Sequence, residues 1–185
     1  GNSPAVGSKS APVLIIEFGC YRCSYTKRAE ATVNQILQHY PDSVRYVYRD
    51  FPLEARHADA NIHSEAARCA ADQGMFWEYH SLLFERQNMS EHNATLRELA
   101  VELGLNASQF SMCLDRQQHL PDVLADFEAG VMAGVYGTPT FFINNRTLVG
   151  PRPLSEFREI IDKELKKLGI KAGEAVTETA DEHEE

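Results

Sequence analysis

The sequence lacks the features that would place this chain across a membrane or on a nucleic acid. No apolar run approaches the roughly 18 residues that a membrane-spanning helix needs. An excess of positive charge is also missing, because 18 Lys and Arg residues face 27 Asp and Glu residues and the net charge is -9. We therefore expect no membrane span in this chain and no nucleic acid among its partners.

Cysteine is scarce as well, with four residues in a chain of 185. A chain this long with so few cysteines is not a small disulfide-stapled fold. The first ten residues carry neither a basic segment nor an apolar core, so no secretory signal is visible in them. Residues 1–10 are small and polar, and residues 171–185 hold six acidic side chains and one lysine. We expect both ends to be flexible.

The first sixty residues show the pattern of a strand, a helix and a second strand. Residues 11–19 are a short, β-branched apolar run that ends at a glycine, which favours a buried strand. Apolar residues then recur at helical spacing over residues 24–40, before a Pro-Asp pair. Residues 43–51 alternate in the manner of a strand. This order predicts two parallel strands joined by a helical crossover.

The rest of the chain divides into a helical block and a second segment that contains strands. Between residues 61 and 134 the sequence is rich in helix-forming residues, and internal glycines mark the expected helix ends. Residues 137–150 contain two short apolar runs around an Asn-Asn pair, which is a hairpin signal. Residues 153–169 follow an amphipathic helical pattern. The whole order, β-α-β, helical block, β-β-α, predicts an α/β fold.

Three segments of this order resemble the DsbA family of thiol-disulfide oxidoreductases. They are VLIIEFG followed by a cysteine, RCAADQGMFWEYHSLLF in the helical block, and GVYGTPTFFIN near the end. The resemblance extends over residues 11–168 and implies a thioredoxin-like core with an all-helical insertion domain. We expect the core to comprise residues 11–60 and 135–170, and the insertion to comprise residues 61–134.

Cys20 and Cys23 have a C-x-x-C spacing and lie between the first expected strand and helix. A helix start offers unpaired backbone N–H groups and the positive end of the helix dipole, and both stabilise a thiolate. The thiolate is the form that attacks a disulfide. Two inert buried thiols or a metal half-site are competing interpretations, but tetrahedral zinc takes four ligands and the sequence holds no second such pair. We expect neither a metal nor an organic cofactor.

The two cysteines do not fall where the family places its pair. The family pattern is E-F-x-D-aromatic-x-C-P-aromatic-C, and EFGCYRCSYTKR aligns beneath it without a gap. Cys23 then matches the first active cysteine, Cys20 matches the acid, and Thr26 stands at the position of the resolving cysteine. The other expected neighbours of the thiol are Tyr21, Arg22, Ser24 and Tyr25. The rival alignment makes Cys20 the nucleophile, but it deletes three residues and would draw the thiol back by up to about 10 Å.

Thr26 leaves the second step of the reaction open, because it has no thiol to resolve a mixed disulfide. Cys20 could resolve it from the upstream side, or a separate thiol molecule could do so. A third option is that the protein holds its substrates without net oxidation. A Cys20–Cys23 disulfide requires Cα atoms within about 7 Å of each other. The Thr26 hydroxyl could also donate a hydrogen bond to the Cys23 thiolate.

The segment GTPT places Pro139 directly after Thr138. In the fold that the resemblance implies, this peptide bond is cis and lies beside the active cysteine. X-Pro bonds are the one kind with a small penalty for the cis form. The backbone of Thr138 is then expected to dock an extended substrate chain. An ordinary turn before a strand is the alternative.

Cys69 and Cys113 lie far apart in the helical block, each with apolar neighbours that would suit a buried thiol. Similar family members pair cysteines at these positions, which implies a structural disulfide and an oxidising compartment. The resemblance thus implies a thiol-disulfide oxidoreductase of periplasmic or secreted location, acting on extracytoplasmic proteins. Its partners would be protein substrates with thiols or disulfides and a membrane redox partner. A non-redox or monothiol module for substrate binding or isomerisation is the alternative.

Overall fold

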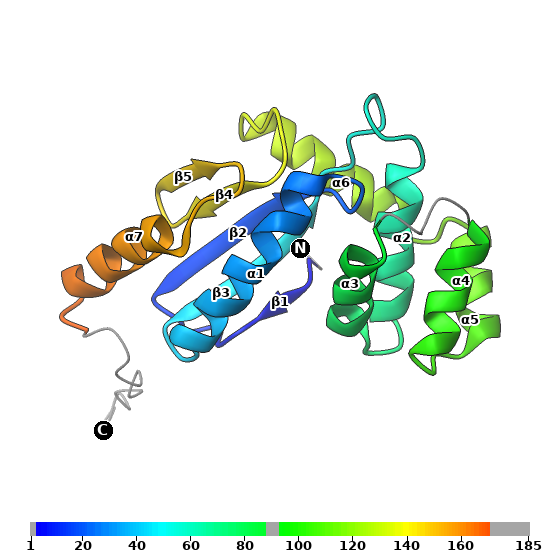
Figure 1. The fold of residues 1–185 in the computed structure, drawn as a ribbon, viewed down its shortest axis with the longest axis horizontal. Coiled ribbons are helices and arrows are strands. Elements are labelled where there is room, and N and C mark those ends of the chain that lie inside the picture. The colour runs from blue at the N-terminus through cyan, green and yellow to red at the C-terminus, as the bar shows by residue number, and fades with distance from the viewer. Residues whose placement is uncertain (1–2, 88–92, 171–185) are drawn as a thin grey trace, which may run out of the picture.

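A computed structural model of the chain describes residues 3–87 and 93–170. The predicted acidic end at residues 171–185 lies outside these residues. The described part contains one five-stranded sheet with the strand order β1-β3-β2-β4-β5 (Figure 1). β2 and β3 are parallel, and the other neighbouring pairs are antiparallel. The strands are β1 Ala5–Val6, β2 Val13–Gly19, β3 Val44–Asp50, β4 Thr140–Ile143 and β5 Arg146–Val149.

Helices cover the sheet and extend beyond it. Figure 1 shows α1 and α7 together on one face of the sheet, while α2 to α5 gather beside it. α6 packs against β3 and against α2. Among the described residues, no helix has both the length and the apolar character needed to cross a bilayer. The helices are α1 Ser24–His39, α2 Ala60–Ala71, α3 Phe76–Glu85, α4 Asn93–Glu102, α5 Ala107–Asp115, α6 Leu120–Met132 and α7 Leu154–Lys167.

The predicted α/β order is confirmed. The β-α-β unit is present as β2, α1 and β3, and the hairpin is present as β4 and β5 with Asn144 in its turn at a φ of 47°. β1 was not predicted, and it lies inside the segment expected to be a flexible end. This strand takes its partners from β3, with Ala5 opposite Val47. Two residues carry too little local pattern to reveal such a pairing from the sequence.

The pairing of β2 determines where the functional residues meet. Phe18 near the end of β2 lies opposite Thr140 at the start of β4. Because the two strands are antiparallel, the chain leaving β2 and the chain entering β4 lie at the same edge of the sheet. Gly19 ends β2, and a Cβ there would lie 2.5 Å from the ring of Tyr48. Only a glycine therefore fits where the chain leaves the sheet.

A buried ionic network ties the helices to the same edge. Arg68 of α2 donates from Nε to the carboxylate of Asp50 at the end of β3, at 2.7 Å. Its Nη2 atom donates to Asp126 of α6, whose carboxylate also accepts from Arg49 Nε at 2.6 Å. Arg68, Asp50 and Asp126 are all buried. Each charge is therefore stable only while its partners remain in place.

Replacing the buried cation tests this network. We expect Arg68→Met to lower the free energy of unfolding by about 3–5 kcal/mol, because Asp50 is left buried without a cation and Asp126 keeps only Arg49. Urea unfolding followed by circular dichroism measures the change. Arg86→Met is the matched control, since the Arg86–Glu102 pair is exposed to solvent, and it should change stability by at most about 1 kcal/mol. Equal unfolding midpoints for the two variants would contradict this account.

Candidate functional site

Cys23 stands at the start of α1. It is the N-cap residue, with an extended backbone at φ -88° and ψ 118°, and its carbonyl accepts from Lys27 N–H at 3.2 Å. The unpaired N–H groups of the first helical turn and the positive end of the helix dipole therefore surround this residue. No acidic residue occupies that turn to oppose them. This is the environment that the sequence predicts for a reactive thiol.

The loop before β4 lies directly against this thiol. The Thr138–Pro139 peptide is cis, as predicted. The Cys23 thiol donates to the carbonyl oxygen of Thr138, with 3.5 Å between sulfur and oxygen. Pro139 O accepts from Gly150 N–H at 2.8 Å, and the Thr140 hydroxyl donates to Gly137 O at 2.7 Å. Hydrogen bonds on both sides therefore hold the loop in place beside Cys23.

Cys20 lies behind Cys23 in a tight turn. The Cys23 N–H donates to Cys20 O at 3.0 Å, which closes a four-residue turn. Such turns keep their end Cα atoms within about 7 Å, a separation that a disulfide can bridge. Both thiols are free in the structure, and both pack against Leu53 and Ala60.

Thr26 contacts the backbone of Cys20. Its Oγ1 atom accepts a hydrogen bond from the backbone N–H of Cys20 at 3.4 Å. Thr26 is fully buried in the first turn of α1. The residue at the family's resolving position thus fastens the turn that carries the other thiol.

The two thiols differ in their access to solvent. Cys20 is 0% exposed and Cys23 is 5% exposed. Burial raises the pKa of the Cys20 thiol above its ordinary value, and hydrogen bonds from the backbone of Leu53 and Arg22 oppose this shift only in part. Cys20 is therefore a neutral, shielded thiol near pH 7.

A cleft of about 490 Å³ opens over Cys23. Of the neighbours predicted from the sequence, Arg22, Ser24 and Tyr25 line it, and so does Thr138. Tyr21 and Thr26 are instead buried behind the thiols. The other lining residues are Leu53, Arg56, His57, Gln87 and Gly137. Most of these additions follow β3, in a segment of irregular structure that has no periodic pattern to indicate which way its side chains face.

A layer of buried polar side chains lies around Tyr21. The Tyr21 hydroxyl is 2.8 Å from His80 Nδ1, and His80 Nε2 is 3.2 Å from a carboxylate oxygen of Glu30. The hydroxyl of Tyr46 donates to Glu17 of β2 at 2.8 Å. Burial raises the pKa of the Glu17 carboxyl well above its usual range, and the charge of Glu30 raises it further. Glu17 therefore holds its proton to higher pH than an exposed acid does.

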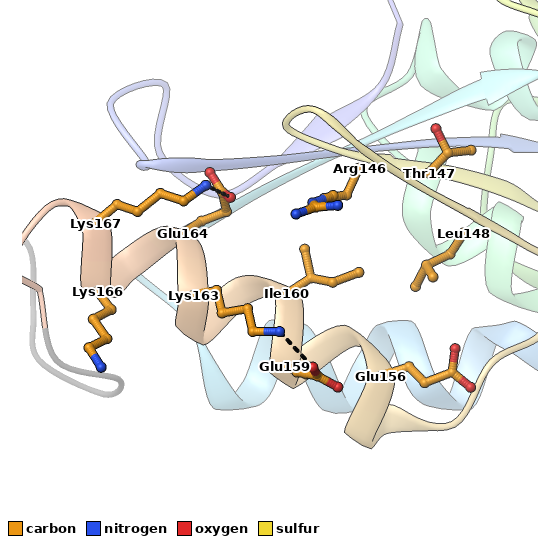
Figure 2. A pocket seen from close by; sticks show the side chains of 10 residues that line it. All are labelled: Arg146, Thr147, Leu148, Glu156, Glu159, Ile160, Lys163, Glu164, Lys166 and Lys167. Atoms are coloured by element: carbon orange, nitrogen blue, oxygen red, sulfur yellow. Dashed lines mark hydrogen bonds and ion pairs between the residues drawn. The ribbon is translucent and has the colours of Figure 1, made fainter.

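A larger hollow of about 710 Å³ lies between β5 and α7, and no cysteine lines it. Figure 2 shows its side chains, among which Lys163 pairs with Glu159 and Lys167 pairs with Glu164. Each lysine lowers the pKa of the carboxyl group that it contacts. These are ion pairs of ordinary surface type, so the chemistry of the molecule points to the cleft at Cys23 instead.

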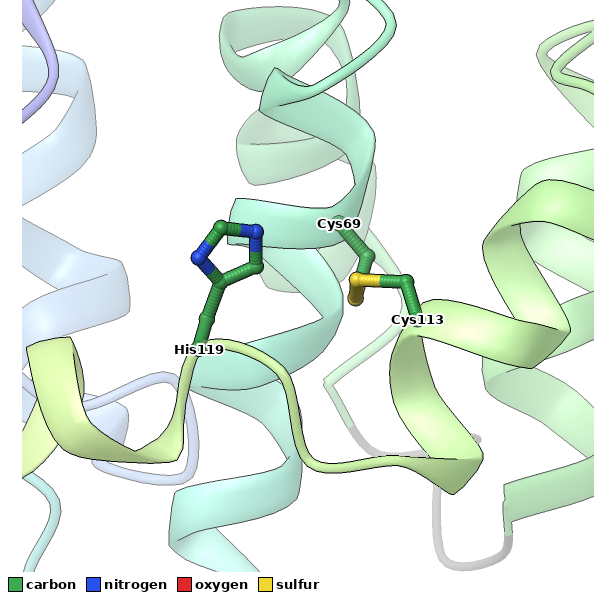
Figure 3. Close-up of side chains that lie close together, drawn as sticks. All are labelled: Cys69, Cys113 and His119. Carbon is green, nitrogen blue, oxygen red and sulfur yellow. A yellow bond between two sulfur atoms is a disulfide. The ribbon is translucent and has the colours of Figure 1, made fainter.

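The second cysteine pair forms the expected disulfide. Cys69 of α2 and Cys113 of α5 are bonded, with their Cα atoms 5.9 Å apart (Figure 3). The bond joins two helices of the block that the sequence places between residues 61 and 134. It closes a loop with a sequence separation of 44 residues.

Comparisons with known proteins place this geometry in context. The family model described as Thioredoxin matches residues 1–163. The chain is 39% identical over 145 residues to the Na(+)/H(+) antiporter NhaA 3 of Salinispora tropica. It is 33% identical over 144 residues to the Na(+)/H(+) antiporter NhaA of Herminiimonas arsenicoxydans. These matches cover 78% of this chain but only 22% of either antiporter, so the chain spans about a fifth of their length.

Several solved structures share the fold of this chain over most of its length. A thioredoxin-like oxidoreductase from Silicibacter pomeroyi shares 26% identity at a TM-score of 0.78, covering 89% of this chain and 93% of that one. Alpha-DsbA1 from Wolbachia pipientis shares 22% identity at a TM-score of 0.77, with 90% and 92% covered. Oxidised BdbD from Bacillus subtilis shares 23% identity at a TM-score of 0.76, covering 89% of this chain and 93% of that one. The thioredoxin-like fold predicted from the sequence is thus confirmed.

The difference between the thiols predicts selective labelling. Brief treatment of the folded, reduced protein with iodoacetamide at pH 7 should label Cys23 first, because Cys20 is shielded and the pKa of its thiol is raised. Peptide mass spectrometry measures both sites. Labelling of Cys20 should increase as the pH rises toward that pKa, and unfolding in urea should make the two sites equally reactive. Preferential labelling of Cys20 in the folded protein would refute this assignment.

Proposed function

This chain belongs to the thioredoxin family, and we propose that it is a DsbA-like thiol-disulfide oxidoreductase with Cys23 as its attacking thiol. One observation supports the proposal above all. The Cys23 sulfur stands at the start of α1, 3.5 Å from the carbonyl oxygen of Thr138 and next to cis-Pro139. A thiol at a helix start is stabilised as a thiolate, and the adjoining cleft gives a substrate access to it.

The first step is attack by the Cys23 thiolate on a substrate disulfide. A bond forms between Cys23 Sγ and one substrate sulfur, and the substrate's S–S bond breaks. The other substrate sulfur leaves as a thiolate and takes up a proton. The hydrogen bond from the Cys23 thiol to Thr138 O is given up when the thiol loses its proton. That carbonyl then becomes free to accept a hydrogen bond from the substrate backbone.

Cys20 carries out the second step. After losing its proton, the Cys20 sulfur attacks Cys23 Sγ, forms the Cys20–Cys23 disulfide and releases the second substrate thiolate. Two electrons have then passed from the cysteine pair to the substrate. The same steps in reverse oxidise a substrate dithiol. Either direction requires a redox partner that resets the pair, and we propose a membrane protein for that role.

Exposed apolar side chains near the cleft suit extended or unfolded protein substrates. Tyr136 is 80% exposed and lies two residues before Thr138. Tyr25, which lines the cleft, is 53% exposed. The backbone of Thr138 and Pro139 would add the substrate as an extended strand, while these side chains contact its apolar residues. In this arrangement the core, residues 11–60 and 135–170, supplies the thiols, and the helical insertion, residues 61–134, contributes Gln87 to the cleft.

The Cys69–Cys113 disulfide supports a location outside the cytoplasm. Stable disulfides form and persist in oxidising compartments. A bond that closes a long loop also stabilises the fold, by about 3–4 kcal/mol, through the unfolded state. We therefore propose a periplasmic or secreted protein whose substrates are other extracytoplasmic proteins.

The alternative is a monothiol or binding module that does not complete the cycle. The burial of Cys20 and the raised pKa of its thiol favour this alternative, because both slow the second step. Such a protein would form mixed disulfides and release them only to a separate thiol, as an isomerase or a holding protein does. The two proposals differ in whether Cys20 is needed for turnover.

Single-cysteine variants separate the two proposals. In insulin reduction with dithiothreitol, Cys23→Ser should reduce activity to the uncatalysed rate, because the attacking sulfur is lost. The double variant Cys69→Ser/Cys113→Ser is the control. It removes two sulfurs elsewhere in the chain and leaves Cys20 and Cys23 intact. It should retain activity well below its lowered unfolding temperature. Full activity of Cys23→Ser would exclude the proposed chemistry.

Cys20→Ser should stall the reaction after its first step and accumulate a mixed disulfide between Cys23 and the substrate. The combined variant Cys20→Ser/Thr26→Cys should restore turnover, because it returns a resolving thiol to the first turn of α1. Non-reducing electrophoresis detects the mixed disulfide directly. Unchanged turnover of Cys20→Ser would favour the monothiol alternative over the two-thiol cycle.

A further inference from the structure

A histidine and a carboxylate lie beside the Cys69–Cys113 disulfide. Figure 3 shows His119 facing the disulfide bond. His119 is the residue that precedes α6. One ligand atom from each of Cys69, Cys113 and His119 lies within 4.8 Å of the other two. Two regions that are distant in sequence, α2 and the stretch from α5 to the start of α6, thus bring two sulfurs and an imidazole together.

A carboxylate completes the group. Asp72 Oδ2 lies 2.8 Å from His119 Nε2 and 3.7 Å from Cys113 Sγ. In a tetrahedral zinc site the usual bond lengths place sulfur and oxygen ligands about 3.6 Å apart, and nitrogen and oxygen ligands about 3.4 Å apart. The sulfur–oxygen spacing already matches, and the nitrogen–oxygen spacing would have to open by roughly 0.6 Å. The two sulfurs, which are bonded to each other in the structure, would have to separate to about 3.8 Å after reduction.

A second carboxylate holds the histidine from behind. Asp122 Oδ2 is 3.3 Å from His119 Nδ1. Metal-bound histidines commonly donate their other ring N–H to a carboxylate, which fixes the tautomer that leaves the metal-facing nitrogen unprotonated. In His119, Nδ1 faces Asp122 and Nε2 faces the carboxylate of Asp72, which accepts a hydrogen bond from an Nε2–H. Zinc would have to replace that Nε2 proton, while Nδ1 keeps its contact with Asp122.

Further negative charge is buried beside the cluster. Glu65 lies one turn before Cys69 on α2 and is 2% exposed. Its Oε2 atom has no hydrogen-bond partner among the described residues. A cation at the cluster would compensate this carboxylate as well.

We propose that reduction of the Cys69–Cys113 disulfide creates a zinc site formed by Cys69, Cys113, His119 and Asp72. A dithiol reductant supplies two electrons, its own sulfurs become a disulfide, and two thiols remain on the chain. Zinc then binds both sulfurs as thiolates and displaces their two protons. Two thiolates and an imidazole suit zinc better than they suit magnesium or calcium, which prefer oxygen ligands.

The site would be controlled by its redox state. A disulfide has no thiolate to offer, so the oxidised chain lacks half of the ligands. A cavity of about 400 Å³ is lined by both cysteines and Asp72, and it gives a reductant and an ion a route to the site. From the sequence alone, no metal is expected anywhere in the chain. The cluster forms only through tertiary packing, since a span of 50 residues separates Cys69 from His119.

Cobalt provides the test, because thiolate-to-cobalt charge transfer and the visible bands of tetrahedral Co²⁺ report the ligands directly. The full chain carrying Cys20→Ser/Cys23→Ser removes the other two thiols. Reduced with a phosphine, which becomes a phosphine oxide by taking oxygen from water, it should bind about one Co²⁺ per chain with a thiolate charge-transfer band. Zn²⁺ should displace the cobalt, and the oxidised protein should show no such band.

Ligand variants in the same background sharpen the result. His119→Ala should weaken zinc binding at least about tenfold, as should Asp122→Asn through the orientation of His119. His39→Ala, an exposed histidine of α1, is the matched control and should bind as the parent does. The proposal is overturned if the reduced protein shows no thiolate band, or if His119→Ala binds zinc as tightly as His39→Ala. It is also overturned if reduction unfolds the protein and zinc does not restore its circular dichroism.

Discussion

The position of the Cys23 thiol depends on how β2 pairs with its two neighbouring strands. β2 pairs in parallel with β3 and antiparallel with β4, and Phe18 lies opposite Thr140. This register places the chain that leaves β2 and the loop that enters β4 at one edge of the sheet. The Cys23 sulfur and the Thr138 carbonyl can meet only for that reason. A slip of one residue would turn every side chain of β2 to the opposite face and separate the two.

The same edge gives two cysteines, three residues apart, different properties. Cys23 caps α1 below an open cleft, whereas Cys20 is enclosed behind it and the pKa of its thiol is raised. Thr26 holds the backbone of Cys20 from the first helical turn. One sulfur is thus accessible and the other is shielded, which suits the attacking and resolving roles that we propose for them. The shielded sulfur lies upstream of the helix rather than within it.

Sequence reasoning identified what depends on local pattern and missed what depends on tertiary packing. The strand-helix-strand order and the hairpin followed from periodicity and turn residues, and the ungapped alignment placed Cys23 at a helix start. The disulfide followed only from the family resemblance. The strand at Ala5–Val6, and His57 in the irregular segment that lines the cleft, had no local signal. The hydrogen bond that the Thr26 hydroxyl accepts from the Cys20 N–H also had no local signal, because the turn brings that N–H within reach.

The central claim is that Cys20 and Cys23 exchange electrons as a pair. It is tested most directly by equilibrating the protein in glutathione buffers of stepped potential, quenching with acid and analysing the peptides by mass spectrometry. The account predicts a single two-electron transition in which both thiols disappear together and an intramolecular Cys20–Cys23 disulfide forms. A glutathione adduct on Cys23, with Cys20 still a free thiol at every potential, would contradict it.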